Sequence, residues 1–434
     1  MTNATQAVEM DQDPPNAPAP EAPICGSGQS PVDALLEGFE GSPTGWSTSG
    51  AWAPIDVYAK TGRGSMDAPA VGFAADYSAV SPPVTIPSGG QLHFDHSYGF
   101  EDYPAEDYPA FNFDGGRVEY STNGTSWNDA GPLFTHNGYD GQFGDSGSGT
   151  NGFVADSYGY RSSRADLSSL AGQSVRLRFR ITTDDSVGDF GWTLDNVRVY
   201  SCVDTTEPTA VAPSSELSTG STFGTSATGA SVPTRISWAA GSDNVTPSGS
   251  LTYRLEERVN SGAWTPVTGF STARSAQRMQ APGRRYEYRV IARDGAGNVS
   301  TPATGLGLRV DARQESSSLV SYSSGWLSRL ARRSAWGAKV RPTTRTGAKA
   351  RSSFTGRSVA VVMPKARNLG TAKVCLLRGA ARRACTTVDQ SPRSGLGQRK
   401  AVFTRNGLSP TQPHRVEVSD VSGRVELDGV VVLK

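Results

Sequence analysis

The run VRLRFRIT at residues 175–182 decides the fold class, because apolar and charged side chains alternate along it without a break. Successive side chains of a β-strand point to opposite faces of a sheet. Val175, Leu177, Phe179 and Ile181 therefore share one face, and the arginines between them share the other. The pattern predicts a strand with one face on a core and the other face in water.

Two flanking runs repeat this strand signal. RVEYSTNGTSW, residues 117–127, alternates, turns at Asn123-Gly124 and returns with Trp127, which predicts a hairpin. WTLDNVRVY, residues 192–200, also alternates, but its phase changes near Asp195-Asn196. We expect a β-bulge or a ligand-holding kink at that point.

Length and composition extend the all-β prediction to the whole chain. The 434 residues include 49 Gly and 27 Pro with only 36% hydrophobic residues, which favours short strands and many turns over long helices. One sandwich domain usually has about 100–200 residues, so we expect several β-sandwich modules in tandem. The sequence shows no run of about 18 apolar residues and neither a basic nor an apolar start, so we expect no membrane span and no signal peptide in this chain.

The four cysteines fall into two natural pairs. Cys25 and Cys202 bracket one candidate domain, and Cys375 and Cys385 flank a turn-like segment symmetrically. Two disulfides would indicate an oxidising compartment, so we expect a secreted, extracellular protein. The alternative is four unpaired buried thiols in a cytosolic protein.

Several motifs in residues 35–202 resemble one known family. In order they are Phe39-Glu40, Asp114-Gly115-Gly116 with Val118 to Ser121, Asn137-Gly138-Tyr139, Asp166 to Ser168 with Ala171-Gly172, Val175 to Arg180, and Gly191 to Asn196. This series resembles the MAM-like jelly-roll domain that follows the catalytic unit in secreted bacterial metallopeptidases of the immune-inhibitor-A and fungalysin-like kinds. The resemblance implies a jelly roll over 29–202. Residues 1–28 are polar and Pro/Ala-rich without a hydrophobic period, which predicts a linker or tail.

Two further modules are expected after the jelly roll. Residues 203–312 look like a fibronectin type III domain, with Trp238 as the core tryptophan and Tyr286 as the corner tyrosine. Residues 313–434 are similar to the small carbohydrate-binding-like jelly rolls that end many secreted actinobacterial proteins. The dense arginine between 329 and 405 departs from what a sugar site of that family implies.

Charge is distributed unevenly along the chain. Residues 1–202 contain 26 acidic and 9 basic residues, whereas residues 313–434 contain 6 acidic and 23 basic ones. The basic end predicts contact with a polyanion such as an anionic cell-envelope polymer. A nucleic-acid partner is not expected, because no nucleic-acid-binding signature accompanies the charge. The alternative is a solvated arginine-rich face of a protein from a high-GC genome.

The inventory of reactive residues does not favour an enzyme. The four histidines, His93, His96, His136 and His414, form no HExxH, and neither a GxSxG elbow nor a P-loop is present. In the strand LHFDH, His93 and Asp95 share one face while His96 points to the other, so a transition-metal site is not favoured either.

Calcium is the cofactor that the resemblance implies. Jelly rolls often join their first and last strands through a hard cation, and Glu40 and Asp195 are the positions that match the family. Asp67 is a third candidate ligand, and other acidic loop residues offer further donors: Glu101, Asp102, Glu106, Asp107, Asp184 and Asp185. The alternative is that these carboxylates are simply solvated.

A short duplication, EDYPAEDYPA at residues 101–110, predicts a projecting loop. Tyr103 and Tyr108 on that loop are candidate ligand-binding residues, since loops on rigid sandwiches carry recognition. Both rings could equally cover the edge of the core.

Together these features predict a non-catalytic accessory region of a secreted bacterial peptidase-type protein, which binds a protein, glycan or cell-surface ligand. The catalytic domain would have been lost or lie upstream. One alternative is a free-standing extracellular adhesin or carbohydrate-binding protein. Another is an enzyme whose active site the motifs do not reveal.

Overall fold

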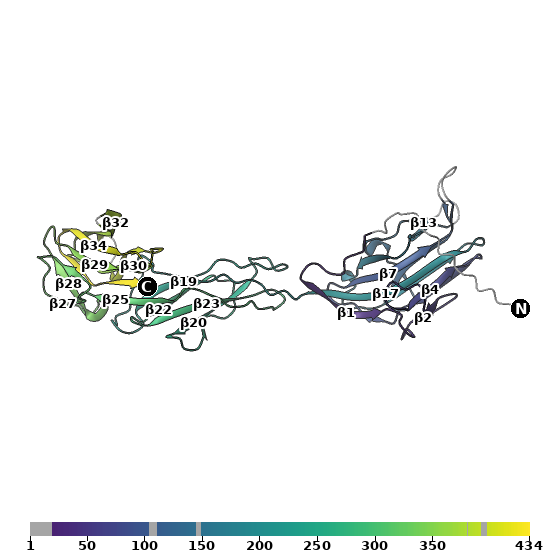
Figure 1. Cartoon of the computed structure of the whole chain (residues 1–434), viewed down its shortest axis with the longest axis horizontal. Coiled ribbons are helices and arrows are strands. Elements are labelled where there is room, and N and C mark those ends of the chain that lie inside the picture. The colour runs from purple at the N-terminus through teal and green to yellow at the C-terminus, as the bar shows by residue number, and fades with distance from the viewer. Residues whose placement is uncertain (1–19, 104–110, 145–148, 380, 392–396) are drawn as a thin grey trace. The chain divides into compact units, whose positions relative to one another are not determined.

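The protein is all-β, as the alternation predicts. The computed structural model describes residues 20–103, 111–144, 149–379, 381–391 and 397–434 (Figure 1). The chain divides into two compact units, Met1–Thr205 and Thr206–Lys434. In the described residues, helical structure consists of three short 3-10 turns, η1 (Gly131–Leu133), η2 (Ser168–Leu170) and η3 (Trp336–Ala338). Among these residues, no helix has the length and apolar character that crossing a bilayer requires.

The N-terminal unit consists of two antiparallel sheets packed face to face. The first has the order β12-β15-β7-β17-β4-β3, with β1 also paired to β17. Its strands are β1 (Gln29–Glu37), β3 (Ala53–Ile55), β4 (Ser65–Ala70), β7 (Gln91–Gly99), β12 (Phe134–His136), β15 (Arg161–Asp166) and β17 (Asp189–Asp204). The second has the order β11-β10-β16-β5-β2, with β6 also paired to β16. Its strands are β2 (Ser47–Thr48), β5 (Ala75–Val80), β6 (Val84–Thr85), β10 (Gly115–Ser121), β11 (Asn128–Asp129) and β16 (Ser174–Thr183).

The core of this unit lies between the two sheets. Val175, Leu177, Phe179 and Ile181 of β16 are fully buried in it, which confirms the predicted face. The predicted hairpin is also present, since β10 pairs with β11 across the turn at Asn123-Gly124. Two further hairpins form separate two-stranded sheets: β8 (Asp102–Tyr103) with β9 (Phe111–Asn112), and β13 (Gly141–Phe143) with β14 (Thr150–Gly152).

The phase change in β17 is a β-bulge. The pairing of β17 with β7 shifts register between Asp195 and Arg198, and Asn196 adopts a left-handed conformation with φ of 48°. Leu194, before the bulge, and Val197, after it, both stay buried. The extra residue therefore keeps apolar side chains on the core face, as predicted.

The C-terminal unit is built around one large antiparallel sheet. That sheet has the order β21-β20-β23-β25-β36-β30-β33, with β24 paired to β23. Its strands are β20 (Thr252–Val259), β21 (Thr265–Pro266), β23 (Arg285–Arg293), β24 (Ala303–Thr304), β25 (Leu308–Gln314), β30 (Ser358–Lys365), β33 (Gly397–Arg405) and β36 (Gly429–Leu433).

Three smaller sheets complete this unit. The first contains β18 (Ser214–Glu216), β19 (Val232–Ser237) and β22 (Ser275–Gln280). The second contains β26 (Ser321–Tyr322), β29 (Ala350–Phe354), β31 (Thr371–Arg378), β32 (Ala381–Asp389) and β34 (His414–Ser422). The third contains β27 (Leu330–Ala331), β28 (Lys339–Thr343) and β35 (Val425–Leu427).

Strand β25 continues through the expected boundary between residues 312 and 313. Its first residues pair with β23, and Val310 to Gln314 pair with β36 at the end of the chain. The side chain of Trp336 enters the same core as Trp238 and donates from Nε1 to the Ser226 carbonyl at 2.8 Å. The two halves of this unit thus share a sheet and a hydrophobic core.

Two residues assigned from the fibronectin type III resemblance occupy the expected environments. Trp238 is buried in the core of the C-terminal unit. The backbone N–H of Ala281 donates to the hydroxyl of buried Tyr286 at 2.7 Å, which is the contact of a corner tyrosine.

Both predicted disulfides are formed. Cys25 pairs with Cys202 and joins the segment before β1 to the end of β17. Cys375 pairs with Cys385 across the adjacent strands β31 and β32. These bonds fit an extracellular protein.

Candidate functional site

A polar groove of about 710 Å³ opens on the N-terminal unit. It lies between η1, β12 and the hairpin of β13 and β14; β13 is labelled in Figure 1. The lining residues are Asp129, Gly131, Pro132, Phe134, Thr135, His136, Asn137, Gly138, Tyr139, Asp140, Gly141, Gln142 and Asn151. Side-chain amides, carboxylates and aromatic rings thus occur together in one concave surface.

Tyr139 is a lining residue of the groove whose side chain is held in place by hydrogen bonds. Its hydroxyl accepts from the backbone N–H of Val118 at 2.9 Å and donates to Asp129 Oδ1 at 2.8 Å. A Cβ at Gly131 would lie 2.5 Å from the Tyr139 ring, so the close approach of η1 requires glycine there. The ring is held rigidly and adds aromatic surface to the groove.

Asn137, another lining residue of the groove, is also held in one conformation. It adopts φ of 43°, a left-handed conformation that asparagine tolerates better than most residues. Its Nδ2 donates to the carbonyl of Ser162 at 2.8 Å and so ties the loop to β15. The groove is therefore held in shape by the sandwich itself.

The titratable groups of the groove are engaged in structural hydrogen bonds. Asp140 accepts from the Val154 N–H at 3.1 Å, from the Tyr98 hydroxyl, and from Arg161 at 3.2 Å. The guanidinium of Arg164 donates to His136 Nδ1 at 2.9 Å. These contacts hold the side chains of His136 and Asp140 against neighbouring structural groups.

Gln142 and Asn151 offer exposed amides at the rim. They lie opposite each other on β13 and β14, and Gln142 Nε2 donates to Asn151 Oδ1 at 2.9 Å. Neither residue could be predicted as a binding candidate from the sequence, because a glutamine and an asparagine near turns have no distinctive spacing. The Asn137-Gly138-Tyr139 motif was noted only as a mark of the fold.

The structure places the predicted calcium ligands Glu40 and Asp195 against one loop. The backbone N–H of Arg63 donates to both carboxylate oxygens of Glu40, and that of Thr61 donates to Asp195 Oδ2 at 2.9 Å. Gly62 has φ of 66°, which favours glycine, and a Cβ there would lie 1.8 Å from Glu40 Oε1 and displace the carboxylate. Backbone N–H groups hold both carboxylates here.

Asp67 lies apart from that pair. Its Oδ1 accepts from the Thr193 hydroxyl at 2.6 Å, and burial raises its pKa. Burial likewise raises the pKa of Asp195, against hydrogen bonds that lower it. Among the described residues, Glu40, Asp67 and Asp195 are not a group whose oxygens converge within 4.8 Å. Calcium at these residues stays a prediction.

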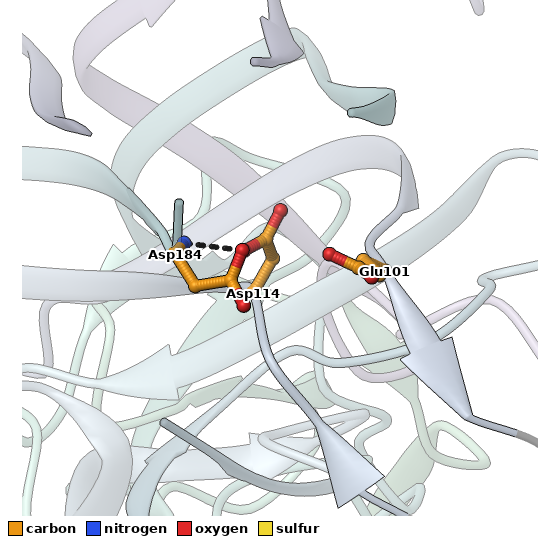
Figure 2. Close-up of side chains that lie close together, drawn as sticks. All are labelled: Glu101, Asp114 and Asp184. Carbon is orange, nitrogen blue, oxygen red and sulfur yellow. Dashed lines mark hydrogen bonds between the residues drawn. The ribbon is translucent and has the colours of Figure 1, made fainter. Parts of the chain in front are cut away.

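Two of the remaining acidic loop residues do converge. Ligand atoms of Glu101 and Asp184 lie within 4.8 Å of each other and of Asp114 (Figure 2). Burial raises the pKa of Asp114 to about 7, and the carboxylates of Asp184 and Glu101 add to the shift. Asp114 was noted only within the Asp-Gly-Gly motif of the fold, so its role as a ligand candidate was missed.

The predicted tyrosine platform lies mostly outside the described residues. Tyr103 belongs to β8, where its backbone pairs with Phe111. Tyr108 falls in 104–110, outside the described part of the chain. Ligand binding by these two tyrosines stays a prediction.

Comparison with known proteins gives no family. No family model matches the chain, and no curated protein matches it. Solved structures with some likeness include the K1 and K3 cleaved adhesin domains of Lys-gingipain from Porphyromonas gingivalis W83. The K1 domain is 18% identical, with 38% of this chain and 97% of that chain covered and a TM-score of 0.24. The K3 domain is 19% identical, with 39% and 99% covered and a TM-score of 0.25.

The FN1–FN3 domains of chicken CNTN1 are a further likeness, at 12% identity, with 83% of this chain and 97% of that chain covered and a TM-score of 0.21. Likenesses at this level carry no argument about function. The fold assignment therefore rests on the strands and sheets described above.

Proposed function

We propose that this chain is a non-catalytic, extracellular binding protein whose N-terminal jelly roll holds a polar ligand, such as a glycan, in the groove around Tyr139. The observation that carries the proposal is the groove itself, in which amides and an aromatic ring are presented on a rigid sandwich. Loops on such scaffolds commonly serve recognition.

The chemistry of the groove matches that of a hydroxyl-rich ligand. Gln142 and Asn151 are exposed, and an amide both donates and accepts hydrogen bonds, as a sugar hydroxyl does. The rings of Phe134 and Tyr139 add apolar surface, with centroids 5.3 Å apart. Because His136 and Asp140 hold neighbouring groups in place, binding is favoured over catalysis here.

Two biological settings fit this proposal. One is an accessory region of a secreted peptidase-type protein, and the other is a free-standing adhesin or carbohydrate-binding protein. The two disulfides support an extracellular location in both settings. A peptidase domain encoded upstream in the same reading frame would favour the accessory setting, so the neighbouring genomic sequence tests the choice between the two.

The basic C-terminal region supports a second binding role. Arg329, Arg333, Lys339 and Arg345 are all exposed within one short stretch, whereas Arg332 is paired with Glu426. We propose that this stretch contacts an anionic cell-envelope polymer. Replacing Arg329 and Arg333 by alanine should weaken retention on an immobilised anionic polysaccharide at low salt. Retention that is the same in about 50 mM and about 200 mM salt would contradict an electrostatic contact.

A glycan array probed with the labelled full chain tests the groove. Binding to a polar glycan is expected, and Gln142→Ala combined with Asn151→Ala should weaken it at least tenfold. Gln173→Ala is the matched control, because Gln173 is exposed on the same unit away from the groove. Unchanged binding by the double variant would place the ligand elsewhere. Turnover of casein or a glycoside by the purified chain would refute a purely binding role.

A further inference from the structure

Three acidic residues from distant parts of the sequence meet at one end of the jelly roll (Figure 2). Glu101 follows β7, Asp114 directly precedes β10, and Asp184 directly follows β16. Because β10 and β16 are antiparallel neighbours, the beginning of one lies beside the end of the other. Sheet topology therefore forces Asp114 and Asp184 together, and Glu101 reaches them from the opposite sheet.

Asp114 is the unusual member of this cluster. Its side chain is 0% exposed, and its Oδ1 accepts from the backbone N–H of Asp184 at 2.8 Å. Its Oδ2 is buried and has no hydrogen-bond partner. A buried carboxylate oxygen without a partner is costly, because it has lost its water and gained nothing in return.

The surroundings of Asp114 intensify this cost. The charged side chains that act on it most strongly are those of Asp184, Glu101 and Asp189, all of them acidic. Glu119, another buried carboxylate of the same unit, is neutralised by arginine, since Arg178 lies 2.5 Å from it. The unpartnered oxygen of Asp114 instead faces carboxylates, and a bound cation would reduce the repulsion between these charges.

Ser186 holds the two outer carboxylates in place. Its backbone N–H donates to Asp184 Oδ1 at 2.9 Å, and its hydroxyl lies 3.1 Å from the same oxygen. The hydroxyl also lies 3.5 Å from Glu101 Oε2. Glu101 and Asp184 are only half-buried, so an ion can reach the buried oxygen of Asp114 from solvent.

The donor set selects the class of cation. All three ligands are carboxylates, hard oxygen donors that suit calcium, whereas zinc prefers histidine and cysteine. Calcium takes oxygen ligands at about 2.3–2.6 Å, so two of its ligands can lie up to about 5 Å apart. The ligand atoms here all lie within 4.8 Å of one another.

We propose that Glu101, Asp114 and Asp184 form a calcium site that joins the start of β10 to the end of β16 and to the segment after β7. This site is distinct from the one expected at Glu40 and Asp195, which uses a different loop. Water molecules would complete the coordination of the ion, since calcium takes about six to eight oxygens. The ion would brace the end of the sandwich from which Glu101 and the following residues leave the sheet.

Calorimetric titration of the chelator-treated full chain with calcium chloride tests the proposal, together with thermal unfolding in calcium and in EDTA. Wild type should bind calcium and unfold at a higher temperature in its presence. Asp114→Asn keeps an acceptor for the Asp184 N–H but removes the charge, and it should weaken calcium binding at least tenfold. Glu101→Gln, at a half-buried position where folding is less sensitive, should also weaken it.

Matched variants separate this site from other acidic loops. Asp185→Asn removes the same charge from an exposed neighbour and should leave the calcium affinity unchanged. Glu40→Gln should leave binding at the Asp114 site intact. The proposal is overturned if wild type binds no calcium, or if Asp114→Asn and Glu101→Gln bind it as wild type does. It is also overturned if Glu40→Gln alone abolishes binding.

Discussion

Asp114 in the N-terminal unit and Asp428 in the C-terminal unit have similar hydrogen bonds but different surroundings. Both side chains are 0% exposed. Each accepts one backbone N–H, from Asp184 at 2.8 Å and from Trp336 at 3.0 Å respectively, and each has a second oxygen without a partner. Burial raises the pKa of Asp114 to about 7 and that of Asp428 to about 8.

What surrounds the unpartnered oxygen differs. Asp114 meets the half-buried carboxylates Glu101 and Asp184, at a position that solvent ions can reach. Asp428 lies beside Glu315, which is itself 3% exposed, within the shared core of the C-terminal unit. The same local hydrogen bond can therefore favour a cation at one position and a retained proton at the other.

The largest expected change in the free energy of unfolding concerns Glu426, a paired carboxylate two residues from Asp428. Glu426 is fully buried and forms ion pairs with Arg332 and Arg424. Glu426→Ala should lower the free energy of unfolding of the C-terminal unit by about 4 kcal/mol, because two guanidinium groups lose their counter-ion. Denaturant unfolding followed by hydrogen exchange of β36 measures this. Glu216→Ala, at an exposed position, is the control. Equal losses of unfolding free energy in the two variants would contradict a special contribution of the Glu426 ion pairs.

Asp428 should make the C-terminal unit less stable as the pH rises. Its carboxyl keeps a proton in the folded protein up to about pH 8, whereas the unfolded chain releases it near pH 4. The folded state therefore binds more protons across this window, and stability falls from pH 5 to pH 8. We expect a loss of about 2 kcal/mol between pH 5 and pH 8. The upper limit over this range is about 4 kcal/mol, at about 1.4 kcal/mol per pH unit, and relaxation of the core around the charge reduces the loss.

Asp428→Asn provides the test of that pH dependence. The amide oxygen can still accept from the Trp336 N–H, so the variant should fold and unfold with little change between pH 5 and pH 8. If the free energy of unfolding falls equally steeply with pH in wild type and variant, another group causes the fall. Glu315 is then the first candidate, since burial raises its pKa as well.

The strands of the N-terminal sandwich could be predicted from the sequence because their signal is local. Alternation of period two marks β16, and the break in phase marks the bulge at Asn196. The two disulfides followed from cysteine positions at the edges of candidate elements. The strand and bulge predictions each needed only the side chains of one short segment, whereas Cys25 and Cys202 are 177 residues apart and were paired because they bracket one candidate domain.

The convergence of distant segments could not be predicted in the same way. Whether Val310 pairs with β23 or with Leu433 of β36 depends on packing across the whole unit, which periodicity does not report. The meeting of Glu101, Asp114 and Asp184 depends on which loops share one end of the sandwich. Many acidic residues could therefore be named as candidate metal ligands from the sequence, but not which of them lie close together.

The smallest effect concerns Asp114 without its cation. In EDTA, Asp114→Asn removes a buried charge that faces other carboxylates, while its amide oxygen still accepts from the Asp184 N–H. It should therefore raise the free energy of unfolding of the N-terminal unit by about 0.5 kcal/mol, although it lowers stability in calcium. Unfolding of wild type and variant in parallel, with and without calcium, measures this reversal of sign. A variant less stable than wild type by the same amount in both buffers would mean that Asp114 serves packing alone, because only a ligand role makes the sign depend on the ion.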